Sequence, residues 1–203
     1  MTDPTQPTPS PRDSRLRFLL GHEFFAAHEW QRRLALWVGA VVVALAAITF
    51  TKASVLAYHL FLRILDYGVW IPLLLTPTVF ALLTWATEGR LRATRGSGIP
   101  QVIATLHIED GGFRDNMLGL WIAISKMVLS LLGLLAGASI GREGPTVHIG
   151  AGLFYWIGRR FGFSDPKAVS RFILAGGACG IAAAFNTPLA GVVFAIEELA
   201  GTF

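Results

Sequence analysis

The sequence is poor in charged residues and in cysteine. Asp, Glu, Lys and Arg together make up 15% of the 203 residues, whereas hydrophobic residues make up 53%. A soluble globular domain has about 25% charged residues, so this composition excludes an ordinary soluble protein. The single cysteine, Cys179, excludes an internal disulfide, and no Cys/His spacing resembles a metal site. The composition indicates a membrane protein, and nothing in it calls for a cofactor.

Uncharged runs long enough to cross a membrane are few. Five runs of at least 15 residues without a charged residue occur, over residues 34–51, 67–87, 127–141, 144–158 and 172–196. A transmembrane helix needs about 20 apolar residues, so some of these runs span a bilayer and others do not. Short or Gly/Pro-interrupted segments are typical of broken helices that line a cavity at the bilayer midplane. We therefore expect an all-α, polytopic membrane protein with broken and re-entrant helices, and a transporter or channel rather than a set of simple anchors.

The first 33 residues precede all of these runs. Residues 1–14 are rich in proline and polar side chains, a composition that buries too little surface to fold, and we expect a disordered tail. Residues 15–33 are amphipathic and predict a cytoplasmic or interfacial helix. Residues 34–203 then form the membrane domain.

Basic residues fall between the apolar runs instead of forming one patch, which argues against nucleic-acid binding. Three clusters are present: Arg12, Arg15, Arg17, Arg32 and Arg33; Arg90, Arg92, Arg95 and Arg114; and Arg159, Arg160, Lys167 and Arg171. The positive-inside rule places all three clusters, and the N-terminus, in the cytoplasm. We expect a multi-pass protein, in a bacterial inner membrane. The run 172–196 must then fold back on itself, and Asn186-Thr187-Pro188 supplies the turn, with Thr187 as N-cap and Pro188 as first helical residue.

One motif places a carboxylate in a very apolar context: Gly141-Arg142-Glu143-Gly144-Pro145. An ionisable side chain at membrane depth is costly unless it faces water, a partner or a transported ion. Pro145 fits the first position of a helix, and the start of a helix offers free N–H groups and partial positive charge. We interpret the motif as an anion site that contains a carboxylate.

Two further motifs have both a functional and an ordinary interpretation. Gly96-Ser97-Gly98-Ile99-Pro100 places small residues before another helix start, where Ser97 can offer a hydroxyl and Gly98 and Ile99 their N–H groups; the same pattern is also an ordinary turn. Glu197-Glu198 ends an apolar stretch. The pair either anchors a helix end among the headgroups or turns one acid toward the interior, since neighbouring helical residues point about 100° apart.

These three motifs, with residues 180–191 leading into Glu197-Glu198, resemble the CLC family of chloride channels and proton-coupled chloride transporters. The order, residue types and approximate spacing match over residues 34–203. The resemblance implies that Ser97 binds the central anion and that N–H groups around Arg142, Glu143 and Gly144 line the outer pathway. It also implies that Glu143 is the gating glutamate and that Glu198 passes protons on the inner side. Lys126 lies where some relatives carry lysine, and we expect carbonyl or carboxylate partners for it, because an isolated buried ammonium is costly.

The implied function is chloride transport, most simply proton-coupled antiport, because plain channels of the family lack an acid at the position of Glu198. The partners implied are chloride, protons and membrane lipid. The family's membrane domain has two inverted halves, and this chain resembles the first, so a homodimer is expected of a complete member and not of this half. A passive channel of the voltage-gated type and an inactive half-protein are the alternatives. An enzyme is not expected: a serine hydrolase using Ser97 or Ser139 with His148 is the weakest interpretation, since no Gly-x-Ser-x-Gly elbow is present.

Overall fold

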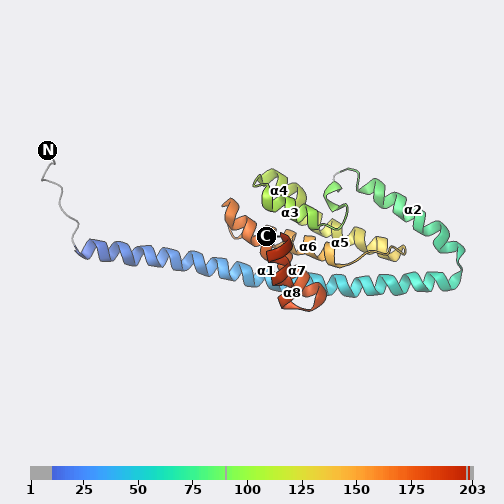
Figure 1. Ribbon diagram of the computed structural model, residues 1–203, viewed down its shortest axis with the longest axis horizontal. Coiled ribbons are helices and arrows are strands. Elements are labelled where there is room, and N and C mark those ends of the chain that lie inside the picture. The colour runs from blue at the N-terminus through green and yellow to red at the C-terminus, as the bar shows by residue number, and fades with distance from the viewer. Residues whose placement is uncertain (1–10, 90, 200, 202–203) are drawn as a thin grey trace.

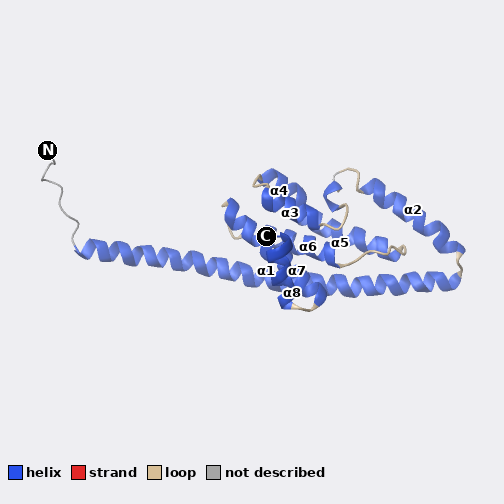
Figure 2. Ribbon diagram, in the orientation of Figure 1, coloured by secondary structure: helices blue, strands red, loops and turns tan. Residues whose placement is uncertain are grey.

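The computed structural model describes the backbone of residues 11–89, 91–199 and 201, with side chains from residue 29 onward. Within these residues the chain is helical, with turns and loops and without strands (Figure 2). The elements are α1 (Pro11–Tyr67), α2 (Trp70–Ala86), the 3-10 turn η1 (Arg92–Thr94), α3 (Ile99–His107), α4 (Gly111–Leu118), α5 (Leu120–Leu135), α6 (Glu143–Arg160), α7 (Pro166–Phe185), α8 (Pro188–Phe194) and the π-helical turn η2 (Ala195–Leu199). The prediction of an all-α fold is confirmed.

Helix α1 runs along the length of the molecule, and the shorter α2 turns back from its C-terminal end (Figure 1). The turn between them contains Gly68, whose φ of +148° favours glycine. The boundary expected between an interfacial helix and the membrane domain, at residue 34, falls inside α1, which is continuous. Residues 1–10 of the expected tail, and the side chains of the expected amphipathic segment up to residue 28, lie outside the described part of the chain.

In the part of the chain that the structure describes, three segments are long and apolar enough to cross a membrane: Glu29–Tyr67, Gly111–Leu135 and Pro166–Phe185. Helix α2 is apolar but shorter. Large apolar side chains point outward from these helices, including Trp37 and Trp70, which are 74% and 78% exposed. So much exposed apolar surface is unfavourable in water and natural against lipid acyl chains. The fold is that of a multi-pass membrane protein.

The run 172–196 folds back as expected. Helix α7 ends at Phe185, Asn186 adopts a left-handed conformation with φ of +53°, and α8 begins at Pro188 with Thr187 as N-cap. The Thr187 side chain makes no capping hydrogen bond, so its contribution is the extended backbone.

The prolines of the two anion motifs lie slightly later in their helices than expected. Pro100 is the second residue of α3 and Pro145 the third of α6, not the first. The shift is tolerated because the first four N–H groups of a helix have no intrahelical acceptor, so a missing N–H costs nothing anywhere in that turn.

Helix α6 lies at the centre and contacts α1, α3, α4, α5 and α7 (Figure 1). It packs most closely on α7, where Gly150 and Gly176 face each other: a Cβ added to either would meet the carbonyl oxygen of the other well inside van der Waals distance. Such small-residue contacts let membrane helices approach backbone to backbone. This packing fixes the position of the α6 start.

Arg114 is the largest fully buried side chain, although it belongs to a cluster interpreted as cytoplasmic charge. Its Nε donates to the carbonyl oxygens of Thr105 and Ile108 at the end of α3. Its terminal nitrogens donate to the Pro166 carbonyl oxygen and the Ser170 hydroxyl of α7. A cation suits the carbonyl end of a helix, so Arg114 joins the end of α3 to the start of α7.

Candidate anion-binding site

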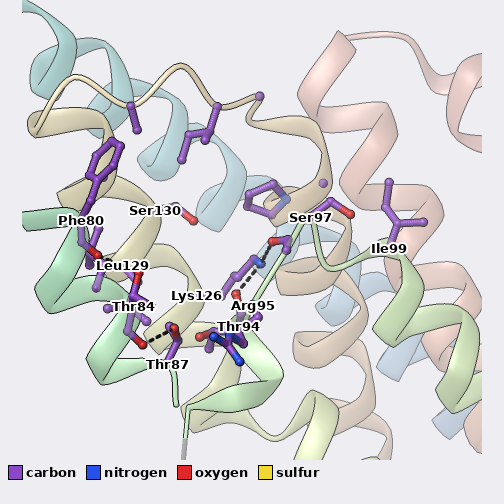
Figure 3. A pocket seen from close by; sticks show the side chains of 18 of the residues that line it. Phe80, Thr84, Thr87, Thr94, Arg95, Ser97, Ile99, Lys126, Leu129 and Ser130 are labelled. Atoms are coloured by element: carbon purple, nitrogen blue, oxygen red, sulfur yellow. Dashed lines mark hydrogen bonds between the residues drawn. The ribbon is translucent and has the colours of Figure 1, made fainter. Parts of the chain in front are cut away.

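A cavity of about 720 Å³ lies between α2, α5 and the starts of α3 and α6 (Figure 3). Its lining comes from four parts of the chain: Phe80, Leu83, Thr84 and Thr87 of α2; Thr94, Arg95, Gly96, Ser97 and Ile99 before and at the start of α3; Lys126, Leu129, Ser130 and Gly133 of α5; and Ala138, Ile140, Gly141, Glu143, Gly144 and Pro145 around the start of α6. Four of the residues predicted from sequence, Ser97, Ile99, Glu143 and Gly144, therefore share one cavity.

The two anion motifs touch directly at Ser97 and Gly144. A Cβ added to Gly144 would lie 2.8 Å from both the Cβ and the carbonyl oxygen of Ser97, so only glycine fits without displacement. The Ser97 side chain is exposed to the cavity, and Figure 3 shows it beside the start of α3. The missing side chain of Gly144 thus allows two distant loops to meet.

Both helix starts at the cavity are open. Helix α3 begins after Gly98, whose φ is +103°, and α6 begins after Arg142. Gly98 has no side chain, and the Arg142 guanidinium has no acceptor atom, so neither N-cap residue can cap its helix through a side chain. The first-turn N–H groups therefore have no partner from the N-cap side chain, and each start carries partial positive charge. Two such helix starts at one cavity suit an anion.

Glu143 is the first residue of α6 and is half-buried. Its carboxylate folds back against Gly141, so close that a Cβ on Gly141 would overlap Oε2. Within the described part of the chain, this carboxylate makes no hydrogen bond or ion pair. A carboxylate beside an open helix N-terminus occupies the kind of position that a small anion would take, and the two would repel each other there.

Lys126 reaches from α5 to the loop that carries Ser97. Its Nζ donates to the carbonyl oxygens of Thr94, at 2.7 Å, and Gly96, at 2.5 Å (Figure 3). The side chain is buried. The expectation of carbonyl partners for this lysine is confirmed, and the bonds fix the loop immediately before Ser97.

Gly98 and Arg142, which were also predicted at the site, do not line the cavity. Gly98 is buried against the ring of His148, where no Cβ would fit. The Arg142 carbonyl accepts hydrogen bonds from the Thr146 N–H and hydroxyl, which begins the α6 ladder. Both residues shape the helix starts without lining the cavity.

His148 is fully buried in α6, and its Nε2 lies 2.8 Å from the Met117 carbonyl oxygen. Its Nδ1 is buried without a hydrogen-bond partner in the described structure. No hydrogen bond between His148 and Ser97 or Ser139 occurs in the same residues, so the arrangement lacks the nucleophile and base pairing that a serine hydrolase uses.

Glu197 and Glu198 lie in η2, where both are exposed. Neither lines the cavity. The structure thus brings the first two motifs together at the cavity, whereas the turn that carries Glu197 and Glu198 contacts α3 outside the cavity.

The sequence interpretation missed the contribution of α2. Phe80, Leu83, Thr84 and Thr87 all line the cavity. Their spacing of three and four residues is that of one helical face, so the signal was present. The hydroxyls of Thr84 and Thr87 donate to carbonyl oxygens of their own helix, which suits polar side chains at membrane depth.

A helical membrane protein with two helix starts at one cavity has the architecture expected of ion channels and transporters. The family described as voltage gated chloride channel matches residues 78–203, which include every residue of the site. The chain belongs to this family.

Two chloride channel proteins are similar to this chain over slightly more than half of its length. The chain is 36% identical over 118 residues to the chloride channel protein CLC-b of Arabidopsis thaliana, a match that covers 52% of this chain and 15% of the relative. It is 35% identical over 116 residues to a chloride channel protein of Schizosaccharomyces pombe, covering 54% of this chain and 16% of the relative. The matched region thus spans less than a fifth of the length of either relative.

Proposed function

We propose that this chain forms one half of a chloride pathway, with Ser97 and the starts of α3 and α6 as its anion-binding wall and Glu143 as its gate. The observation that carries the proposal is the contact of Ser97 with Gly144 at a cavity that Glu143 also lines. An ionised Glu143 would compete with chloride for the N–H groups of the α6 start. A protonated Glu143 loses that charge and gives way to the anion. In this proposal chloride crosses the membrane and no covalent bond is made or broken.

We further propose that transport is coupled to protons, with Glu198 as the inner proton-transfer group. Glu198 follows the buried Ala195 by three residues and precedes the buried Leu199, which places it nearer the packed side of the turn than Glu197. The second candidate is a passive channel, which the names of both relatives favour. Joint measurement of chloride and proton flux separates the two.

The test of the gate is Glu143→Gln in a polypeptide continued through the second inverted half, reconstituted in liposomes. The amide keeps the shape of the side chain but cannot ionise. We expect chloride to pass while proton flux falls to the level of protein-free liposomes. A matched control is Glu88→Gln, which removes an exposed acid beyond the end of α2. Proton-coupled chloride flux that is unchanged in the Glu143 variant would refute the gating role.

For orientation we propose a cytoplasmic N-terminus. Arg32 of α1 and Arg171 of α7 line one common cavity, so two of the three basic clusters meet at the same end of the molecule. Positive charge concentrated at one end favours the cytoplasmic side for that end.

For assembly we propose a homodimer of the complete protein, supported by the exposed apolar face of α8, where Leu189 is 79% exposed.

A further inference from the structure

A second cavity lies far from the anion site, between α1 and the connection from α6 to α7. Its volume is about 610 Å³, within the range of small-ligand pockets. Arg32 and Leu36 come from one wall, and Arg171 and Phe172 from the other. Two guanidinium groups thus stand beside apolar side chains in one pocket, a combination that neither chloride conduction nor helix packing requires.

The acids of this cavity are already engaged. The Glu29 carboxylate accepts from Nη2 of Arg32 at 2.9 Å, and the Asp165 carboxylate accepts from the Ala168 N–H at the start of α7, also at 2.9 Å. The arginine N–H groups of this cavity, in contrast, do not all have acceptors. Nε of Arg32 is buried without a hydrogen-bond partner, and Arg171 is exposed and forms no ion pair with any described residue. A buried donor without an acceptor is unfavourable, so an anionic oxygen that bonded to Nε would remove that cost.

The surroundings place this cavity at the membrane surface. Trp30 and Trp37 project from α1 on either side of Arg32, exposed by 68% and 74%, and the Arg33 guanidinium lies 5.8 Å from the Trp30 ring centroid. Tryptophan is enriched at the level of lipid headgroups, where its ring meets acyl chains and its N–H meets water. Arg160 and Lys167 add exposed positive charge on the connection between α6 and α7.

We propose that this cavity binds the headgroup of an anionic phospholipid. The phosphate oxygens bind Arg171 and the unpartnered Nε of Arg32, and the acyl chains lie along the apolar wall formed by Leu36 and α1. Basic pockets between membrane helices on the cytoplasmic side suit such headgroups. A bound lipid would join α1 to α7, and through α7 it would support the packing that fixes the start of α6.

The experiment uses the 203-residue chain purified in detergent and analysed by native mass spectrometry after equal exposure to phosphatidylglycerol or phosphatidylcholine with identical acyl chains. We expect the wild type to retain phosphatidylglycerol preferentially. The double variant Arg32→Gln/Arg171→Gln should lose this preference, by roughly fivefold for each arginine. The control Arg63→Gln/Arg92→Gln removes the same charge from exposed positions outside the cavity and should retain the lipid.

Two further variants keep the test decisive. Arg171→Gln alone removes an exposed side chain without a described partner, so this variant should fold like the wild type. Its retention of phosphatidylglycerol should still fall. Glu29→Gln removes the acid that competes for Arg32 and should raise retention. The proposal is overturned if both double variants lose the lipid equally, or if both lipids are retained equally. Displacement of the lipid by excess inorganic phosphate would also overturn it, because that result would identify a site for free anions.

Discussion

At the scale of single residues, the anion site depends on side chains that hold the backbone in place. Lys126 is the main example, because its ammonium group has two carbonyl oxygens as partners and both belong to the loop before Ser97. Removing it would leave one buried and one partly buried carbonyl oxygen without this donor and would free the loop to move. We therefore expect the lysine to act by positioning Ser97.

We predict that Lys126→Met lowers the free energy of unfolding by about 1.5–3 kcal/mol, the usual contribution of hydrogen bonds to a charged group. Anion affinity should fall as well, since Ser97 loses its fixed position. Equilibrium unfolding in mixed micelles and calorimetric anion titration check the two parts. Lys52→Met, an exposed lysine on α1, is the control and should change stability by less than about 0.5 kcal/mol. Wild-type anion affinity in the Lys126 variant would show that the loop keeps its shape without the two hydrogen bonds from Lys126.

At the scale of elements, the site is a meeting of two helix starts, and glycine decides how close they come. Gly144 at the start of α6 leaves room for Ser97 before α3, and Gly98 leaves room for His148 of α6. The loop and the helix interlock at these two points. The anion-binding wall therefore has this geometry because Gly144 and Gly98 have no side chains.

We predict that Gly144→Ala destabilises the fold by about 1–3 kcal/mol and weakens anion binding, because the new methyl group would overlap both Cβ and the carbonyl oxygen of Ser97. Gly89→Ala is the matched control, since no heavy atom lies within 4 Å of its added Cβ. Thermal unfolding and calorimetric anion titration of the two variants provide the comparison. If the two variants behaved alike, the close contact between the helix starts would not determine anion affinity.

At the scale of the whole molecule, the proposed proton route includes a group outside the cavity. Glu198 lies in a π-helical turn, a local distortion that is frequent at functional sites. The buried neighbours Ala195 and Leu199 anchor this turn against the protein. Its two acids can therefore differ in role although both are exposed.

We predict that Glu198→Gln abolishes proton flux from the inner side, while Glu197→Gln has a smaller effect, because neighbouring positions of a helical turn point in different directions and Glu198 lies nearer the buried Ala195 and Leu199. The measurement is chloride and proton flux in liposomes over a range of internal pH, in the polypeptide that carries both halves. Coupled flux should lose its pH dependence in the first variant only. Equal losses in both variants would mean that the pair anchors the helix end instead of passing protons.

The sequence was enough to predict the all-helical membrane fold, the reversal at Asn186 and the need of Lys126 for oxygen partners. Each of these follows from local chemistry: apolar runs, turn residues next to proline, and the cost of an isolated buried charge. Residues that belong to a helix start were recognisable because glycine and proline act on the backbone within one turn.

Which of those residues meet depends on how the helices pack together. The contact of Ser97 with Gly144, the contribution of Thr84 and Thr87, and the burial of Arg114 between α3 and α7 all join residues from different helices. The periodicity of a sequence tells which face of a helix is apolar, but not which neighbour covers it. Close packing between helices settles that choice, because a few tenths of an ångström at a glycine decide whether two backbones can touch.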